Sequence, residues 1–121
     1  MMQTLLIVDD EESLRLTLRL RLKDQGFNVL VAEDGETALE LLKTNKVDLI
    51  LLDINMPKMD GYGVIRHIRA QSEHKTTPIL VLTTESETDK RNLARDAGAT
   101  GWMVKPFDPA ALIATINKVS P

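Results

Sequence analysis

The sequence predicts a doubly wound α/β domain with a five-stranded parallel sheet, and three observations support this. Five short apolar runs recur along the 121 residues, and each is followed by a longer stretch with the composition of a helix. The central run, 47–52, is almost continuously apolar, which is typical of a strand buried on both faces. Polar residues directly follow the runs, as they do where parallel strands end at one edge of a sheet. We therefore expect one domain over residues 1–121.

The segment after the first run contains five leucines that alternate with polar residues, from Leu14 to Leu22. Alternation alone favours a strand, but Leu, Arg and Lys are helix formers, and the segment lies between acids at 9–12 and Gly26. We predict a helix here. On that helix Leu16 and Leu20 lie opposite the stripe formed by the other three leucines, so we expect them to be exposed.

The remaining elements are bounded by capping residues, glycines and prolines. Asp34 and Asp108 suit the N-cap of a helix, Pro109 suits the first helical position, and Gly98 ends the helix before it. In chain order the predicted elements are strand 5–8, the leucine-rich helix, strand 28–32, helix 35–44, strand 47–52, helix 61–70, strand 79–82, helix 87–97, strand 102–104 and a last helix from 109 onward.

Composition and charge exclude several function classes. The net charge of -3 and the pI near 5.3 leave no basic surface for direct nucleic-acid binding. Cysteine is absent, which excludes disulfides and thiol catalysis, and no apolar run is long enough to span a membrane. We expect a cytoplasmic protein. His67 and His74 are too few for a His-rich metal site, and we expect both to be solvated.

Polar groups at the ends of separate strands form the candidate site. They are Asp9 and Asp10 after the first strand, Asp53 after the third, Thr83 after the fourth and Lys105 after the fifth. Three carboxylates at one edge repel one another unless a cation neutralises them, and oxygen ligands suit Mg²⁺. Each residue alone has an ordinary explanation as a cap, a strand former or a solvated charge. Their joint placement suits phosphoryl transfer to Asp53, with Lys105 and Thr83 binding the anion.

The same residues carry a resemblance to response-regulator receiver domains of the single-domain, CheY-like kind. The similar segments are LLIVDDEE (5–12), LLDINMPKMDG (51–61), VLTTE (81–85) and ATGWMVKPF (99–107). The resemblance implies the flavodoxin-like (βα)5 sandwich and makes Asp53 the phosphoacceptor. It also implies that Asp10 binds Mg²⁺ directly, Asp9 mainly through water and Asn55 through its backbone carbonyl. Thr83 and Lys105 would bind phosphoryl oxygens, and the Lys105-Pro106 bond would be cis.

The resemblance further implies a switch. Trp102 stands where the family has an aromatic side chain that rotates inward on phosphorylation, and a Trp packed half-buried at the sheet edge is an equally open interpretation. Asn55 and Glu85 match the pair found in CheY at positions that set how fast the acyl phosphate hydrolyses. A short-lived phosphorylated state is implied.

Two binding surfaces follow from the same resemblance. The target surface is expected on the fourth helix, the fifth strand and the fifth helix, around Lys90, Arg91, Arg95 and Trp102. The histidine kinase is expected to dock on Leu16 and Leu20, for which a harmless pair of exposed leucines is the competing interpretation.

We therefore predict a stand-alone, monomeric response regulator that is not a classical enzyme. It accepts a phosphoryl group from a histidine kinase or histidine phosphotransfer protein and then binds a downstream protein, plausibly in chemotaxis. Because the sequence ends just after the last helix, we expect output through protein binding. A phosphate sink without output is the main alternative.

Two further alternatives are disfavoured. A haloacid-dehalogenase-type phosphotransferase needs an acid two residues after the nucleophile, where this chain has Asn55. A flavodoxin-like cofactor binder needs a phosphate-binding loop after the first strand, where this chain has acids.

Overall fold

In the computed structural model, which describes residues 2–55, 60–84 and 88–119, five parallel strands form one sheet. The strands are β1 (Thr4–Val8), β2 (Asn28–Ala32), β3 (Leu49–Asp53), β4 (Ile79–Thr83) and β5 (Gly101–Val104), in the spatial order β2-β1-β3-β4-β5. The helices are α1 (Glu12–Asp24), α2 (Gly35–Thr44), α3 (Gly61–Ala70), α4 (Thr88–Ala97) and α5 (Pro109–Val119), with a short 3-10 helix, η1 (Ser72–His74). The predicted fold is confirmed. None of the described helices is long and apolar enough to cross a membrane.

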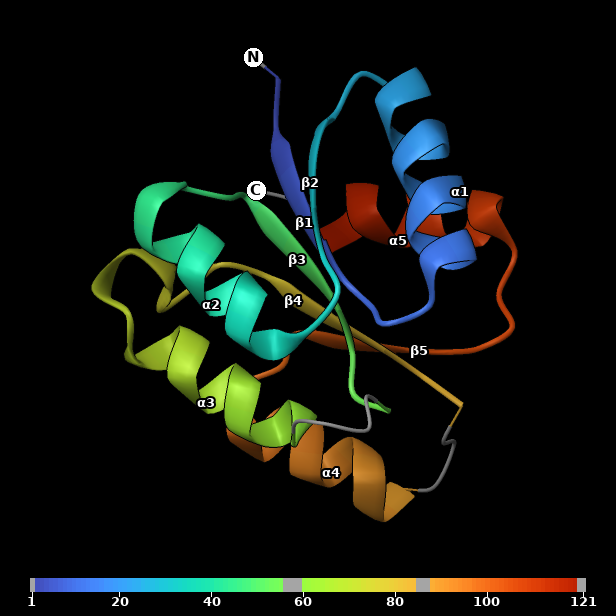
Figure 1. The fold of residues 1–121 in the computed structure, drawn as a ribbon. Helices are drawn as coiled ribbons and strands as arrows, with labels where there is room; N and C mark the ends of the chain where they lie inside the picture. Colours follow the sequence, from blue (N-terminus) through green and yellow to red (C-terminus); the bar gives the residue numbers. More distant parts are fainter. Residues whose placement is uncertain (1, 56–59, 85–87, 120–121) are drawn as a thin grey trace.

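Helices cover both faces of the sheet, with α1 and α5 on one face and α2, α3 and α4 on the other (Figure 1). Because successive side chains of a strand point to opposite faces, each strand contributes to two cores. In β3, Ile50 and Leu52 pack toward α2, α3 and α4, while Leu49 and Leu51 pack toward α1 and α5. All five residues of β3 are buried, as the continuous apolar run predicts.

The leucine-rich segment is a helix, as predicted, and its two faces differ in burial. Leu18 and Leu22 are buried against the sheet, and Leu14 packs beside them. Leu16 and Leu20 are 57% and 62% exposed. The prediction that this pair lies on the outer face is confirmed.

Several strand boundaries differ from the prediction by one or two residues: the first strand begins at Thr4, the third ends at Asp53 and the fourth ends at Thr83. The third strand begins at Leu49 rather than at 47, and just before it the Asp48 side chain accepts a hydrogen bond from the Thr4 backbone N–H at 2.8 Å. The fifth strand begins one residue early, at Gly101. The predicted start of the fourth helix at Glu87 lies outside the described residues. Asp34 accepts a hydrogen bond from the Thr37 N–H at 2.8 Å, which confirms its capping role.

Arg69 ties the end of α3 to two other segments. Its guanidinium group donates to the Gly98 carbonyl from Nε (3.0 Å) and Nη2 (2.7 Å). Its Nη1 donates to the carbonyls of His74 (3.0 Å) and Thr77 (2.6 Å). Gly98 has a φ of +119°, and a Cβ there would lie 2.9 Å from the Arg69 side chain, so this contact requires glycine.

The prediction that His74 is solvated is wrong, whereas His67 is exposed as predicted. The His74 ring is buried, with Nε2 3.5 Å from the Val47 backbone N–H and Nδ1 3.2 Å from Gln71 Oε1. Because an N–H can only donate, Nε2 is the acceptor and Nδ1 carries the proton. Burial lowers the pKa of His74; the Glu73 charge opposes this shift, while the nearby cations Lys46 and Arg69 add to it.

We predict that His74 makes the fold less stable in mild acid. The lowered pKa means that, below about pH 6.5, the unfolded chain binds a proton that the folded chain does not, so stability falls with pH. Urea unfolding at several pH values should show the stability advantage of wild type over His74→Gln shrinking as the pH falls below this value. The matched control, His67→Gln, should keep the wild-type pH profile. An advantage of wild type over His74→Gln that is constant across this range would contradict the prediction.

Candidate functional site

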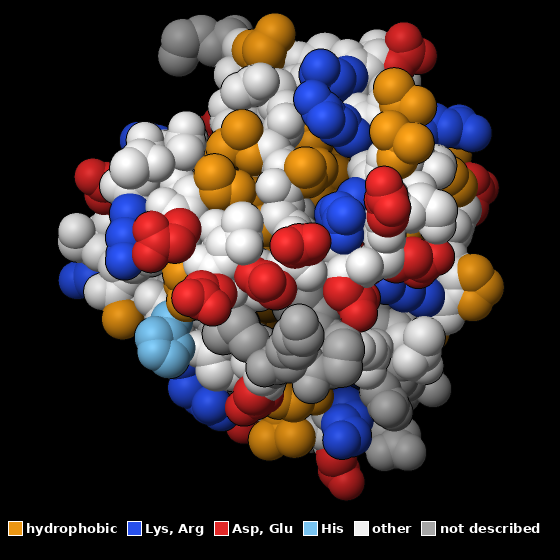
Figure 2. Space-filling model, in the orientation of Figure 1, with side chains coloured by type: hydrophobic (Ala, Val, Ile, Leu, Met, Phe, Trp, Pro, Cys, Tyr) orange, Lys and Arg blue, Asp and Glu red, His pale blue; other side chains and the backbone are white. Residues whose placement is uncertain are grey.

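Three carboxylates meet at the edge of the sheet where β1 and β3 end. Asp9 and Asp53 are buried and Asp10 is exposed. One oxygen from each of the three lies within 4.8 Å of the others. These are the hard oxygen donors that Mg²⁺ prefers, so the residues fit the predicted metal. Figure 2 shows that acidic side chains gather across the middle of the face that is turned to the viewer.

Lys105 reaches this cluster from the end of β5, on the far side of β4. Its Nζ lies 2.8 Å from Asp9 Oδ2 and 3.4 Å from Asp53 Oδ2. Burial alone would lower the pKa of Lys105, but the hydrogen bond and charge of Asp9, together with the charge of Asp53, raise it. The Lys105-Pro106 peptide bond is cis, as predicted.

The pKa of Asp53 is raised above the usual value for an aspartate. Burial raises the pKa of Asp53, and the Asp9 charge adds to this rise. The hydrogen bond from the Asn55 backbone N–H to Asp53 Oδ1, at 2.8 Å, and the Lys105 charge lower that pKa, but they do not outweigh burial. More positive charge beside Asp53 would therefore favour its ionised form, which is the form that can act as a nucleophile.

Asp9 has a partner on each oxygen. Its Oδ1 accepts a hydrogen bond from the Glu11 backbone N–H at 2.9 Å, and its Oδ2 accepts one from Lys105. Its backbone carbonyl accepts one from Arg15 at 2.8 Å. Asp9 is therefore oriented by the protein before any ion binds, whereas Asp10 faces solvent.

Thr83 lies at the end of β4, and its hydroxyl donates a hydrogen bond to Asn55 Oδ1 at 2.6 Å. The family resemblance implies a backbone ligand role for Asn55 and, with Glu85, a place in setting the rate of acyl-phosphate hydrolysis, but it does not predict a side-chain contact with Thr83. Thr83 and Asn55 are 28 positions apart, so no local sequence pattern predicts their side-chain contact. The sequence indicates only that each residue lies where a strand gives way to a turn. Glu85 lies outside the described residues.

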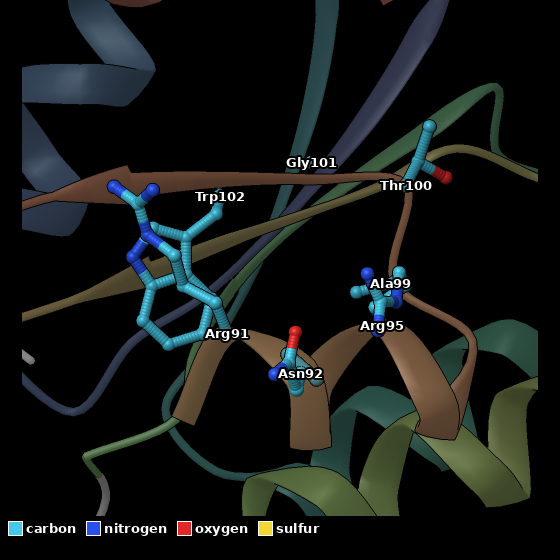
Figure 3. Close-up of a pocket in the computed structure, with 8 residues that line it drawn as sticks. Arg91, Asn92, Arg95, Ala99, Thr100, Gly101 and Trp102 are labelled. Atoms are coloured by element: carbon cyan, nitrogen blue, oxygen red, sulfur yellow. The ribbon is translucent and has the colours of Figure 1, made fainter. Parts of the chain in front are cut away.

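A separate pocket lies between α4 and β5, and its volume is about 360 Å³. The pocket is lined by Arg91, Asn92 and Arg95 of α4 and by Trp102 of β5, and Figure 3 shows Arg91 beside Trp102 with Arg95 farther along α4, near Ala99. Trp102 is half-buried, and its Nε1 is buried with no hydrogen-bond partner among residues 2–55, 60–84 and 88–119. Lys90 is partly buried on the same helix. The structure thus brings the predicted target residues together, and places Leu16 and Leu20 apart from them on α1.

The fold and this site define a class of small doubly wound domains with a buried aspartate at the end of the central strand, beside two further acids and a lysine. The chain belongs to the response regulator receiver domain family, whose family model matches residues 5–117. Members of this family are signalling phosphoacceptors of two-component systems rather than classical enzymes.

Solved structures and curated relatives agree with this assignment. Chemotaxis protein CheY4 of Vibrio cholerae is 42% identical with a TM-score of 0.95, and the match covers 98% of this chain and 99% of that chain. The receiver domain of the Pseudomonas aeruginosa sensor histidine kinase PA1611, solved with a magnesium ion in its active-site cleft, is 30% identical with a TM-score of 0.88, covering 98% and 97%. The regulatory protein PhoP of Bacillus subtilis, which controls alkaline phosphatase synthesis, is 40% identical over 98% of this chain and 49% of its own length. The chain spans about half the length of the curated relatives it matches.

We predict that replacing Lys105 strengthens metal binding. Lys105→Met removes the cation that competes for Asp9 and Asp53, so Mg²⁺ should bind about tenfold more tightly. Calorimetric titration with Mg²⁺, without any phosphate donor, measures the affinity directly. Lys43→Met, which removes an exposed lysine paired with Glu40 on α2, is the matched control and should leave the affinity unchanged. An affinity that stays the same or weakens in Lys105→Met would contradict the prediction.

Proposed function

We propose that this domain accepts a phosphoryl group on Asp53 from a histidine kinase or a histidine phosphotransfer protein, and then changes its affinity for a target protein. One observation carries the proposal: the buried Asp53 carboxylate stands at the end of the central strand, within reach of Asp9, Asp10 and Lys105. An Asp53 oxygen attacks the phosphorus of a phosphohistidine and forms a P–O bond. The P–N bond breaks, its electron pair stays on the histidine nitrogen, and that nitrogen takes a proton.

The surrounding residues are proposed to bind charge around that step. The carboxylates of Asp10 and Asp53 and the Asn55 carbonyl would hold Mg²⁺ directly, and Asp9 mainly through water; the ion would supply positive charge that offsets the repulsion between these acids and the incoming phosphate. The Lys105 ammonium group, 3.4 Å from Asp53, binds a phosphoryl oxygen, and the Thr83 hydroxyl donates to another. Asn55 and Glu85 are further proposed to make the acyl phosphate on Asp53 short-lived.

The proposed target surface is the face formed by α4, β5 and α5. The pocket beside Trp102 supports it, because the pocket combines an aromatic wall with the cations Arg91 and Arg95. The nearly complete match to a chemotaxis protein favours a chemotaxis component as the target. If no protein binds the phosphorylated form more tightly than the free form, the domain acts as a phosphate sink.

The curated relatives favour a second candidate for the output. Those that the chain matches over about half their length are described as transcriptional regulators. In this alternative the same α4, β5 and α5 face controls a transcription factor segment, and phosphorylation changes promoter occupancy rather than the affinity for a chemotaxis component.

We predict that Asp53 gains one phosphoryl group in a Mg²⁺-dependent reaction. Intact mass after incubation with acetyl phosphate should rise by one phosphoryl group with Mg²⁺ and stay unchanged without it. Asp53→Asn should abolish the gain, because an amide is not a nucleophile of this kind. Asp34→Asn is the matched control, since Asn also caps helices well, and it should be phosphorylated like wild type. A gain that survives in Asp53→Asn would overturn the proposed site.

We predict that the kinase docks on the exposed leucines of α1. Combining Leu16→Ser with Leu20→Glu should slow phosphotransfer from the cognate kinase about tenfold or more, because the change removes apolar area from the interface and puts an unpaired charge there. Phosphorylation by acetyl phosphate should be unchanged, since α1 takes no part in the chemistry. Leu93→Ser on α4, where Leu93 is 46% exposed, is the control for losing an exposed leucine. Equal phosphotransfer rates for the double variant and wild type would rule out the docking role.

A further inference from the structure

One side-chain oxygen, Asn55 Oδ1, holds the end of β4 to the end of β3. It accepts hydrogen bonds from the Thr83 hydroxyl at 2.6 Å and from the Thr84 backbone N–H at 3.0 Å. The Thr84 hydroxyl makes a longer contact with the same oxygen, at 3.5 Å. Because a backbone N–H can only donate, the carboxamide must present its oxygen rather than its nitrogen to β4.

Asn55 is also joined to the phosphoacceptor. Its backbone N–H donates to Asp53 Oδ1 at 2.8 Å, so one residue contacts the carboxylate through its main chain and Thr83 through its side chain. Asp53 and Thr83 are both buried, whereas Asn55 and Thr84 are exposed. The three hydrogen bonds of Asn55, two accepted by Oδ1 and one donated by its backbone N–H, therefore lie between the buried Asp53 and Thr83 and the solvent.

The bond to Asn55 uses the only proton of the Thr83 hydroxyl. A hydroxyl group has one O–H donor, so it cannot donate to Asn55 and to a phosphoryl oxygen at the same time. The O–O distance of 2.6 Å lies at the short end of the range for such bonds, which marks a well-formed interaction. Before Thr83 can bind a phosphoryl group on Asp53, the hydrogen bond to Asn55 must break.

We propose that Asn55 is a positioning residue whose side-chain oxygen holds Thr83 and Thr84 in the arrangement of the unphosphorylated domain and so opposes phosphorylation. The inference rests on the proposed function, because the competitor for the Thr83 hydroxyl is the phosphoryl group on Asp53. It assigns to the Asn55 side chain a role separate from that of its backbone carbonyl. Losing one such hydrogen bond changes an equilibrium about fivefold, which is the size of effect expected.

Two substitutions separate the oxygen from the shape of the side chain. Asn55→Leu has nearly the same shape without an acceptor, while Asn55→Asp keeps an oxygen in the same place. Asn117→Ala, at an exposed position on α5, is the matched control. Hydrogen exchange of the Thr84 amide, measured without metal or donor, should be about fivefold faster in Asn55→Leu and unchanged in Asn55→Asp and in the control. No acceleration in Asn55→Leu, or equal acceleration in Asn55→Asp, overturns the inference.

The second measurement is the rate of phosphorylation by acetyl phosphate at saturating Mg²⁺. Asn55→Leu should react about fivefold faster than wild type, because its Thr83 hydroxyl no longer has to leave Asn55. Asn55→Asp should not react faster, since it keeps the acceptor. If wild type is phosphorylated on Asp53 but Asn55→Leu is no faster, this inference fails while the proposed function stands. If wild type itself gains no phosphoryl group, both fail.

Discussion

The Lys105 ammonium group, held between the carboxylates of Asp9 and Asp53, is the interaction on which the rest of the site depends. Two buried carboxylates at one sheet edge are costly unless a cation compensates them. Lys105 follows β5, and both β4 and β3 separate that strand from β1, where Asp9 lies. One side chain therefore links three strand ends at 2.8 Å and 3.4 Å. A divalent ion would compete for the same oxygens, so metal binding and the position of Lys105 are coupled.

The apolar layers allow this charged edge to exist. Every residue of β3 is buried, and its apolar side chains pack alternately into the two cores on either side of the sheet. Burial of that apolar surface contributes most of the stability of a domain of this size, so a repulsive polar edge is tolerated. Leu16 and Leu20 lie outside both cores. Their side chains do not pack in either core, so they remain available to contact a partner protein.

The fold was predictable because its signals are local, and the parts that were not predicted depend on distant partners. Apolar runs, caps and glycines lie within a few residues of the elements that they define, as Asp34 does for α2. The meeting of Asp9, Asp53 and Lys105 followed from the rule that parallel strands end at one edge. The burial of His74 did not, because it depends on Val47, 27 residues earlier. The Asn55 side-chain contact with Thr83 was missed for the same reason.

The register of β4 and β5 makes the path from Asp53 to the Trp102 pocket short. Trp102 pairs with Val81, and Val81 lies two residues before Thr83, so these side chains share the face toward α4. Asn55 is hydrogen-bonded to Thr83, the last residue of β4, and Val81 of the same strand pairs with Trp102. The buried Trp102 Nε1, without a partner in the described part of the chain, costs about 1–3 kcal/mol. A shift of Thr83 that rearranges α4 and gives this N–H an acceptor would recover that energy. The arrangement seen here thus combines hydrogen bonds that hold Thr83 and Thr84 at Asn55 with an unsatisfied N–H at Trp102.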